Sequence, residues 1–184
     1  MSLRWEPIPE MTDEFEGERL DAAKWWDVNP HWEGRPPALF MASNVRVAGG
    51  RLMLTARAEN PPPPQRPEYH TFTTAAVKSR AKALYGYFEI QCRPMKSRAS
   101  SAFWFYDSTP EEWTEIDVFE MAAGDPTRLQ AVFLNAHVFY TPAHKGPHLE
   151  HGTRWEMGQN VADADHRYGL LWTAKTVRWF IDGQ

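Results

Sequence analysis

Short runs of alternating apolar and polar residues recur along this chain of 184 residues, and they constrain its fold more than any other feature. In residues 51–57 and 86–94 every second side chain is apolar, a period that is typical of a half-buried strand and not of a helix. Turn-forming residues separate the runs. Strands are expected at residues 51–57, 86–94, 101–106, 129–135, 168–172 and 176–182. Closely spaced short strands predict an all-β fold, an antiparallel sandwich or barrel.

One proline-rich stretch departs from this pattern. Residues 60–70, "NPPPPQRPEYH", cannot join the interior of a sheet because proline has no N–H to donate, so we expect a stiff surface loop there. The sequence has neither an internal repeat nor a marked domain boundary, so residues 1–184 are expected to form a single domain. Cys92 is the only cysteine, so no internal disulfide can hold the fold.

Composition narrows the classes of partner. The net charge is −4 and the charges are interspersed, which argues against a nucleic-acid-binding surface. No apolar run is long enough to span a bilayer, and the first residues lack the apolar segment of a signal peptide. The 9 Trp, 6 Tyr and 10 Phe suit a surface that stacks on flat apolar partners such as sugar rings.

The stretch "WTEIDVFEM", residues 113–121, concentrates negative charge in an otherwise apolar run. Side chains alternate on a strand, so Glu115 and Asp117 share one face while Ile116 faces the core. Glu120 has the opposite parity. A β-bulge between Asp117 and Glu120 would return it to the face of the other two acids. The sequence therefore predicts three carboxylates in a row.

Such a row is costly, because like charges repel and raise the pKa of at least one group. Its most direct use is acid–base chemistry: cleavage of a glycosidic bond needs two carboxyl groups, one ionised and one protonated, which lie roughly 5 Å apart in retaining enzymes. Two other interpretations stay open on the pattern alone. The acids could be solvated charges on an edge strand, or they could bind calcium.

The signature Glu-x-Asp-x-x-Glu in "EIDVFE" resembles that of glycoside hydrolase family 16, in the bulged form found in laminarinases, agarases, porphyranases and κ-carrageenases. Other segments resemble the family in the same order: "DEFEGERLDAAKW" (13–25), "NVRVAGGRLMLTA" (44–56), "YGYFEIQCRPM" (85–95), "SAFWFY" (101–106) and "HRYGLLWTAKTVRWFIDGQ" (166–184). The resemblance implies a concanavalin A-like β-jelly-roll sandwich of two curved antiparallel sheets, with a cleft along the concave face. Members of the family usually continue beyond the last hairpin, so we expect a C-terminally truncated domain that lacks its final strands.

The resemblance also implies catalytic roles and a substrate. Glu115 would be the nucleophile, Glu120 the general acid and base, and Asp117 would balance proton and charge between them. The chain would be a retaining, endo-acting glycoside hydrolase that cleaves β-linked galactans of red algae, of agarose or porphyran type, by double displacement. The alternatives are a laminarinase-like or κ-carrageenase-like β-glycanase, transglycosylation in place of hydrolysis, and a non-catalytic carbohydrate-binding jelly roll.

Five residues are predicted to bind the substrate. By resemblance to agarases and porphyranases, Trp32 and Arg35 would reach the negative subsites, and His137 would lie near the acids. Strand parity places Trp104 and Trp113 on the face of Glu115, where they could stack on sugar rings. Each could equally be a structural residue.

No cofactor is expected to be required. The resemblance allows a structural calcium ion on the convex side, but the sequence names no ligands for it, so the metal assignment is unknown. His144, His148 and His151, with Glu150, offer zinc-type ligands, but without a fixed periodicity we favour a loop bordering the cleft. The expected partner is a polysaccharide, and the complete domain is expected to be a monomer. A secreted or periplasmic location is expected from the size of the substrate.

Overall fold

The computed structural model describes residues 5–63, 66–141, 143 and 145–184. They fall into two compact units, residues 1–83 and 84–184, each of which is described by itself. The expectation of a single domain therefore stays a prediction. The described residues contain no α-helix, and no segment among them is long and apolar enough to cross a membrane as a helix.

The first unit consists of short strands and two 3-10 turns. Strand β2 pairs in parallel with β6, which also pairs antiparallel with β5; β3 pairs with β4, and β1 pairs with β7. The elements are η1 (Pro9–Met11), β1 (Trp25–Trp26), β2 (Ala38–Phe40), η2 (Ala42–Asn44), β3 (Val45–Val47), β4 (Leu52–Leu54), β5 (Arg57–Ala58), β6 (Phe72–Thr74) and β7 (Lys78–Ser79).

Two expectations for this unit need correction. The strand expected at 51–57 is split, because β4 ends at Leu54 and β5 joins a different sheet. The described part of the proline-rich stretch forms no strand, as expected, but it is not wholly on the surface. Pro61 and Tyr69 are buried, and the Tyr69 hydroxyl donates a hydrogen bond to the Gly34 carbonyl at 3.3 Å.

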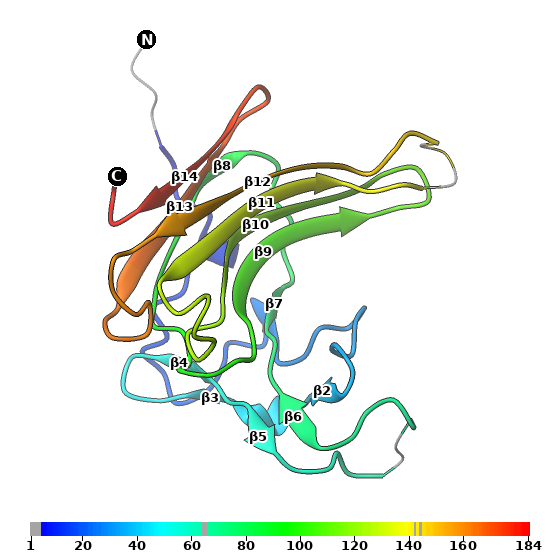
Figure 1. Ribbon diagram of the computed structural model, residues 1–184, viewed down its shortest axis with the longest axis vertical. Coiled ribbons are helices and arrows are strands. Elements are labelled where there is room, and N and C mark those ends of the chain that lie inside the picture. Colours follow the sequence, from blue (N-terminus) through cyan, green and yellow to red (C-terminus); the bar gives the residue numbers. More distant parts are fainter. Residues whose placement is uncertain (1–4, 64–65, 142, 144) are drawn as a thin grey trace. The chain divides into compact units, whose positions relative to one another are not determined.

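The second unit is built from two antiparallel sheets. One has the order β12-β11-β10-β9 and the other the order β14-β13-β8. Figure 1 shows the four long strands of the first sheet side by side. The bounds are β8 (Gly86–Cys92), β9 (Ser101–Ser108), β10 (Trp113–Met121), β11 (Ala131–Val138), β12 (Leu149–Glu156), β13 (His166–Trp172) and β14 (Val177–Ile181).

The hydrophobic core of the second unit is formed by residues from both sheets. Val118 and Met121 from β10, and Tyr168 and Leu170 from β13, are all at most 1% exposed. The predicted alternation in β8 is observed, because its apolar side chains pack against this core. Burial of these side chains is the main stabilising contribution to a sandwich of this kind.

The structure also corrects the expected strand boundaries. The strand expected at 129–135 begins at Ala131 and runs to Val138. Residues 149–152, expected in a loop bordering the cleft, belong to the eight-residue strand β12, in which every residue is exposed. Because β12 has no buried face, its sequence carries no apolar alternation that would have indicated a strand.

Candidate active site

The predicted β-bulge is present in β10. Asp117 lies opposite Asn135 of β11, whereas Glu120 lies opposite Phe133, so the register shifts between the two acids. Two consecutive core residues, Val118 and Phe119, mark the extra position. Glu115, Asp117 and Glu120 therefore share the face of the sheet that points away from the core, which we call the acid face.

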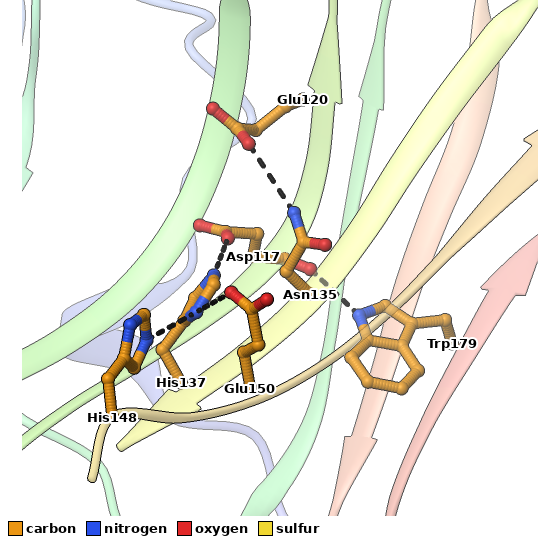
Figure 2. Close-up of polar contacts among 7 residues, drawn as sticks. All are labelled: Asp117, Glu120, Asn135, His137, His148, Glu150 and Trp179. Atoms are coloured by element: carbon orange, nitrogen blue, oxygen red, sulfur yellow. Dashed lines mark hydrogen bonds and ion pairs between the residues drawn. The ribbon is translucent and has the colours of Figure 1, made fainter. Parts of the chain in front are cut away.

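A tryptophan from the opposite sheet supports the bulge. The indole Nε1 of Trp179, on β14, donates a hydrogen bond of 2.8 Å to the backbone carbonyl of Asp117 (Figure 2). A bulge leaves a backbone group without its regular ladder partner, and a buried carbonyl without a donor is destabilising. Trp179 thus fixes the backbone at the middle acid through the core.

The strand register assigns neighbours to each acid. Glu115 lies between Tyr106 and His137, Asp117 between Trp104 and Asn135, and Glu120 between Ala102 and Phe133. On β12 the corresponding positions are Glu150, Gly152 and Arg154. A surface hollow of about 490 Å³ lies over β11 and β12, and its lining residues are Phe133, Asn135, His137, Glu150, His151, Gly152, Thr153 and Arg154.

The carboxyl group of Asp117 is buried beside two other acids. The residue is only 5% exposed, and burial raises the pKa of its carboxyl group to about 7, with further increases from the charges of Glu115 and Glu120. His137, whose Nε2 lies 3.5 Å from Asp117 Oδ2, and the Asn135 amide act in the opposite direction. Asp117 can therefore hold a proton near neutral pH between two carboxylates.

The side chain of Asn135 contacts the third acid. Its Nδ2 donates a hydrogen bond of 3.4 Å to Glu120 Oε2 (Figure 2). Gly152 lies opposite Asn135, and a Cβ atom at this position would overlap Asn135 Oδ1. The glycine therefore gives the amide the room it needs to lie beside Glu120.

Two of the predicted substrate-binding residues belong to an aromatic cluster at one end of the acid face. Trp113 is 41% exposed, and its ring lies 4.5 Å from that of Phe139. Phe139 in turn stacks on His137 at 5.3 Å and on His148 at 4.6 Å. The predicted positions of Trp113 and His137 on the acid face are thus observed; sugar binding by them stays a prediction.

Trp104 has the predicted parity, because it lies directly opposite Asp117 on β9. Trp32 and Arg35 lie in the first unit, where both are exposed and Trp32 packs edge-on against Phe40 at 5.1 Å. The turn that carries them is held by a hydrogen bond of 2.9 Å from Ala38 N to the Arg35 carbonyl. Their participation in substrate binding stays a prediction.

Two groups among the described residues bring three metal-type ligands together: Glu115 with Asp117 and His137, and His137 with His148 and Glu150. Neither supplies the six to eight oxygens that calcium prefers, so the calcium suggested by the resemblance has no ligands assigned. Of the zinc-type residues noted in the sequence, His144 lies outside the described residues. Alternation along β12 points His151 away from Glu150.

Sequence reasoning missed several residues of this site. Asn135 could have been found, because it precedes His137 by two positions on one strand and so shares its face. Gly152, His148 and Glu150 depend on the pairing of β11 with β12, and the contact of Trp179 depends on the packing of two sheets. No local sequence signal reports either of these.

Comparisons with known proteins agree with this geometry. Residues 5–184 match the family model described as "Beta-porphyranase A-D, GH16 domain". A curated relative, beta-porphyranase E of Zobellia galactanivorans, is 32% identical over 195 residues, which cover 99% of this chain and 68% of the relative. Since the match extends over nearly the whole chain, the protein belongs to glycoside hydrolase family 16, in its beta-porphyranase A–D group.

Solved structures support the same assignment. The crystal structure of porphyranase B from Zobellia galactanivorans superposes with a TM-score of 0.86 at 28% identity, covering 96% of this chain and 72% of that one. The beta-porphyranase BpGH16B from the gut bacterium Bacteroides plebeius gives a TM-score of 0.76 at 27% identity, covering 98% and 72%. The predicted jelly-roll fold and the predicted family are therefore confirmed, as is the general class of glycoside hydrolase.

Proposed function

We propose that this chain is a retaining, endo-acting glycoside hydrolase that cleaves β-linked galactans of red algae, of porphyran or agarose type. The observation that carries the proposal is the acid face, on which the buried Asp117, with its raised pKa, lies between Glu115 and Glu120. The choice of polymer rests on the relatives, whose names are those of beta-porphyranases.

In the first step, the Glu115 carboxylate attacks the anomeric carbon, the glycosidic C–O bond breaks, and Glu120 gives its proton to the leaving oxygen. In the second step, Glu120 takes a proton from water, which attacks the same carbon and releases Glu115. Two inversions retain the configuration. The Asn135 amide contributes by holding the Glu120 carboxyl group in a fixed orientation.

Asp117 supports this cycle through its protonation state. Its pKa is raised partly by the negative charge of Glu115, and that charge disappears when Glu115 forms an ester bond with the sugar. Glu120 becomes ionised in the same step, and its charge, which also raises the pKa of Asp117, replaces that of Glu115. Asp117 can therefore keep its proton beside one carboxylate throughout the cycle. Deglycosylation, in which water attacks the ester, restores the charge of Glu115 and the proton of Glu120.

The hollow beside the acids is suited to a sugar ring. Phe133, opposite Glu120, lines the hollow, and the guanidinium groups of Arg128 and Arg154 lie over its ring, 5.4 and 5.7 Å from the centroid. Arg154 is held by hydrogen bonds to Glu156 and to the Thr127 carbonyl. Aromatic rings and fixed polar groups of this kind are the usual components of carbohydrate sites.

Release of reducing ends from porphyran, agarose, κ-carrageenan and laminarin would test the proposal. We expect cleavage of porphyran or agarose by the parent chain and none by Glu115→Gln. Cleavage of laminarin or κ-carrageenan alone would contradict the proposed substrate and identify that polymer as the substrate. Binding of a polymer without cleavage, by a chain shown to be folded, would favour a carbohydrate-binding protein and contradict the proposal.

We also infer a secreted or periplasmic location, because a polymeric substrate does not enter cells. A monomeric state of the complete protein is a separate proposal. Cell fractionation and light scattering test these two inferences. Recovery of the protein in the cytoplasmic fraction, or a dimer mass, would contradict them.

A further inference from the structure

We propose that His137, His148 and Glu150 form a binding site for a divalent transition metal ion, with zinc as the best match, at the edge of the acid face. His137 Nδ1 lies 3.1 Å from His148 Nε2 and 3.9 Å from Glu150 Oε2. Figure 2 shows the two imidazoles and the carboxylate gathered at one point. The three ligand atoms come from two adjacent strands and the segment that connects them.

The spacing of these atoms matches a tetrahedral ion. Zinc–ligand bonds of 2.0–2.2 Å place neighbouring ligand atoms roughly 3.3–3.5 Å apart. The observed 3.1 and 3.9 Å lie on either side of that range, and a small rotation of the exposed Glu150 side chain would bring its oxygen closer. A fourth position is left for water, as in sites with three protein ligands.

The second ring nitrogen of His137 has the partner that metal-binding histidines usually have. Its Nε2 lies 3.5 Å from the buried Asp117 carboxyl group, so Nε2 can carry the proton while Nδ1 is free to bind a metal. A carboxylate behind a histidine fixes its tautomer and orientation. Phe139, stacked against both imidazoles, restricts their rotation further.

The ligand types decide which ions fit. Two imidazole nitrogens and one carboxylate oxygen favour zinc, copper or cobalt, whereas calcium and magnesium prefer sites made of oxygens. The ligands are accessible, because His148 and Glu150 are exposed. His148 and Glu150 have no role in the proposed chemistry, which leaves them available for this function.

Binding at this site would inhibit turnover, an effect that rests on the proposed function. A bound ion places positive charge on the far side of His137 from Asp117 and occupies space beside Glu115, the register neighbour of His137. The site would then act as a reversible inhibitory metal site. Its existence, in contrast, can be tested without any substrate.

The test is titration of the full chain with Co²⁺, followed by its visible absorption, and with Zn²⁺, followed by calorimetry. We expect one ion per chain, the intense bands of tetrahedral Co²⁺, and an affinity at least about 10-fold weaker in His148→Ala and in Glu150→Gln. His151→Ala, a histidine change on the opposite face of β12, is the matched control and should bind as the parent does. Circular dichroism checks that each variant is folded.

Equal affinity in His148→Ala and His151→Ala, or no binding by the folded parent, would overturn the proposal. In the activity measurement, Zn²⁺ should slow the parent, EDTA should restore it, and His148→Ala should be insensitive. If Zn²⁺ binds at these residues but no polymer is cleaved, the proposed function fails and the metal site stands.

Discussion

The two sheets of the second unit each place an aspartate beside a histidine, yet the pKa values of the two aspartates are shifted in opposite directions. On the first sheet Asp117 lies near His137, and burial together with two like charges raises its pKa to about 7. On the second sheet Asp182, next to β14, lies near His166, and its pKa is lowered.

The difference lies in the donors around each carboxylate. Asp182 Oδ1 accepts a hydrogen bond of 2.9 Å from the Arg167 backbone N–H, and Oδ2 lies 2.7 Å from His166 Nδ1. Nearby, Asp165 lies 3.3 Å from Arg93. Donors and cations stabilise the ionised form, whereas burial among carboxylates stabilises the protonated form. Identical residue types thus serve structure on one sheet and are suited to proton transfer on the other.

The largest expected effect is a loss of activity that occurs for a change on the first sheet and not for a change on the second. Glu115→Gln should lower turnover by about 10³-fold or more, since the nucleophile is lost. Glu89→Gln, on the outer face of β8, removes a carboxylate that accepts a hydrogen bond from Tyr87 and should leave turnover unchanged. Initial rates on the polymer that the parent cleaves provide the measurement. Similar losses of turnover in both variants would contradict the different roles assigned to the two sheets.

Asp117→Asn should stabilise the folded chain at neutral pH, although changing a buried polar group usually destabilises a protein. The folded-state pKa of about 7 lies above the ordinary 3.8, so the parent loses stability as pH rises through this window. Asparagine does not ionise, so the variant should gain up to about 4 kcal/mol relative to the parent between about pH 4 and about pH 8. Denaturant unfolding at both pH values measures the gain, and a constant difference would contradict the assigned pKa.

Each sheet also contains a glycine that makes room for a side chain on its outer face. A Cβ at Gly152 would overlap the Asn135 amide, and one at Gly169 would crowd the Tyr87 ring. We expect Gly152→Ala to lower turnover about 10-fold, through Asn135 and Glu120, and Gly169→Ala to affect only stability.

A double variant refines this test. If Gly152 acts through Asn135, then Gly152→Ala should add nothing to the loss caused by Asn135→Ala, because coupled sites are not additive. Independent losses that multiply would show that Gly152 acts by another route. Thermal unfolding of each variant separates loss of structure from loss of activity.

The smallest effect is expected for Asp182→Asn. A lowered pKa means that the ionised carboxylate contributes stability above the ordinary pKa of 3.8, and that this contribution is lost as pH falls. The variant should therefore be slightly less stable than the parent near neutral pH, and the two should converge in acid. The effect is small because the side chain is half exposed. A difference that grows as pH falls would contradict the assigned direction.

Much of this site could be predicted from local sequence. Strand alternation in β10 predicted the common face of Glu115 and Asp117, and the parity of Glu120 required a bulge, which is present. The acid row is therefore encoded in a few consecutive residues. The fold was accessible for the same reason, since most core strands alternate and turn residues separate them.

The remainder depends on contacts between distant segments. β12 is exposed along its whole length, so its sequence carries no periodic signal. His148 and Glu150 meet His137 only because of the register between β11 and β12, and Trp179 reaches the bulge only because the two sheets pack face to face. Such contacts become visible only in the folded structure.

The central claim is that Glu115, in the row held by the bulge, forms a covalent bond with the sugar. The most direct measurement is mass spectrometry of the chain after reaction with a 2-deoxy-2-fluoro galactan disaccharide fluoride, which slows release of the intermediate. We predict one adduct, assigned to Glu115 by fragmentation of the peptide that contains all three acids, and none in Glu115→Gln. An adduct on Asp117 or Glu120, or hydrolysis with inverted configuration and no adduct, would contradict the account.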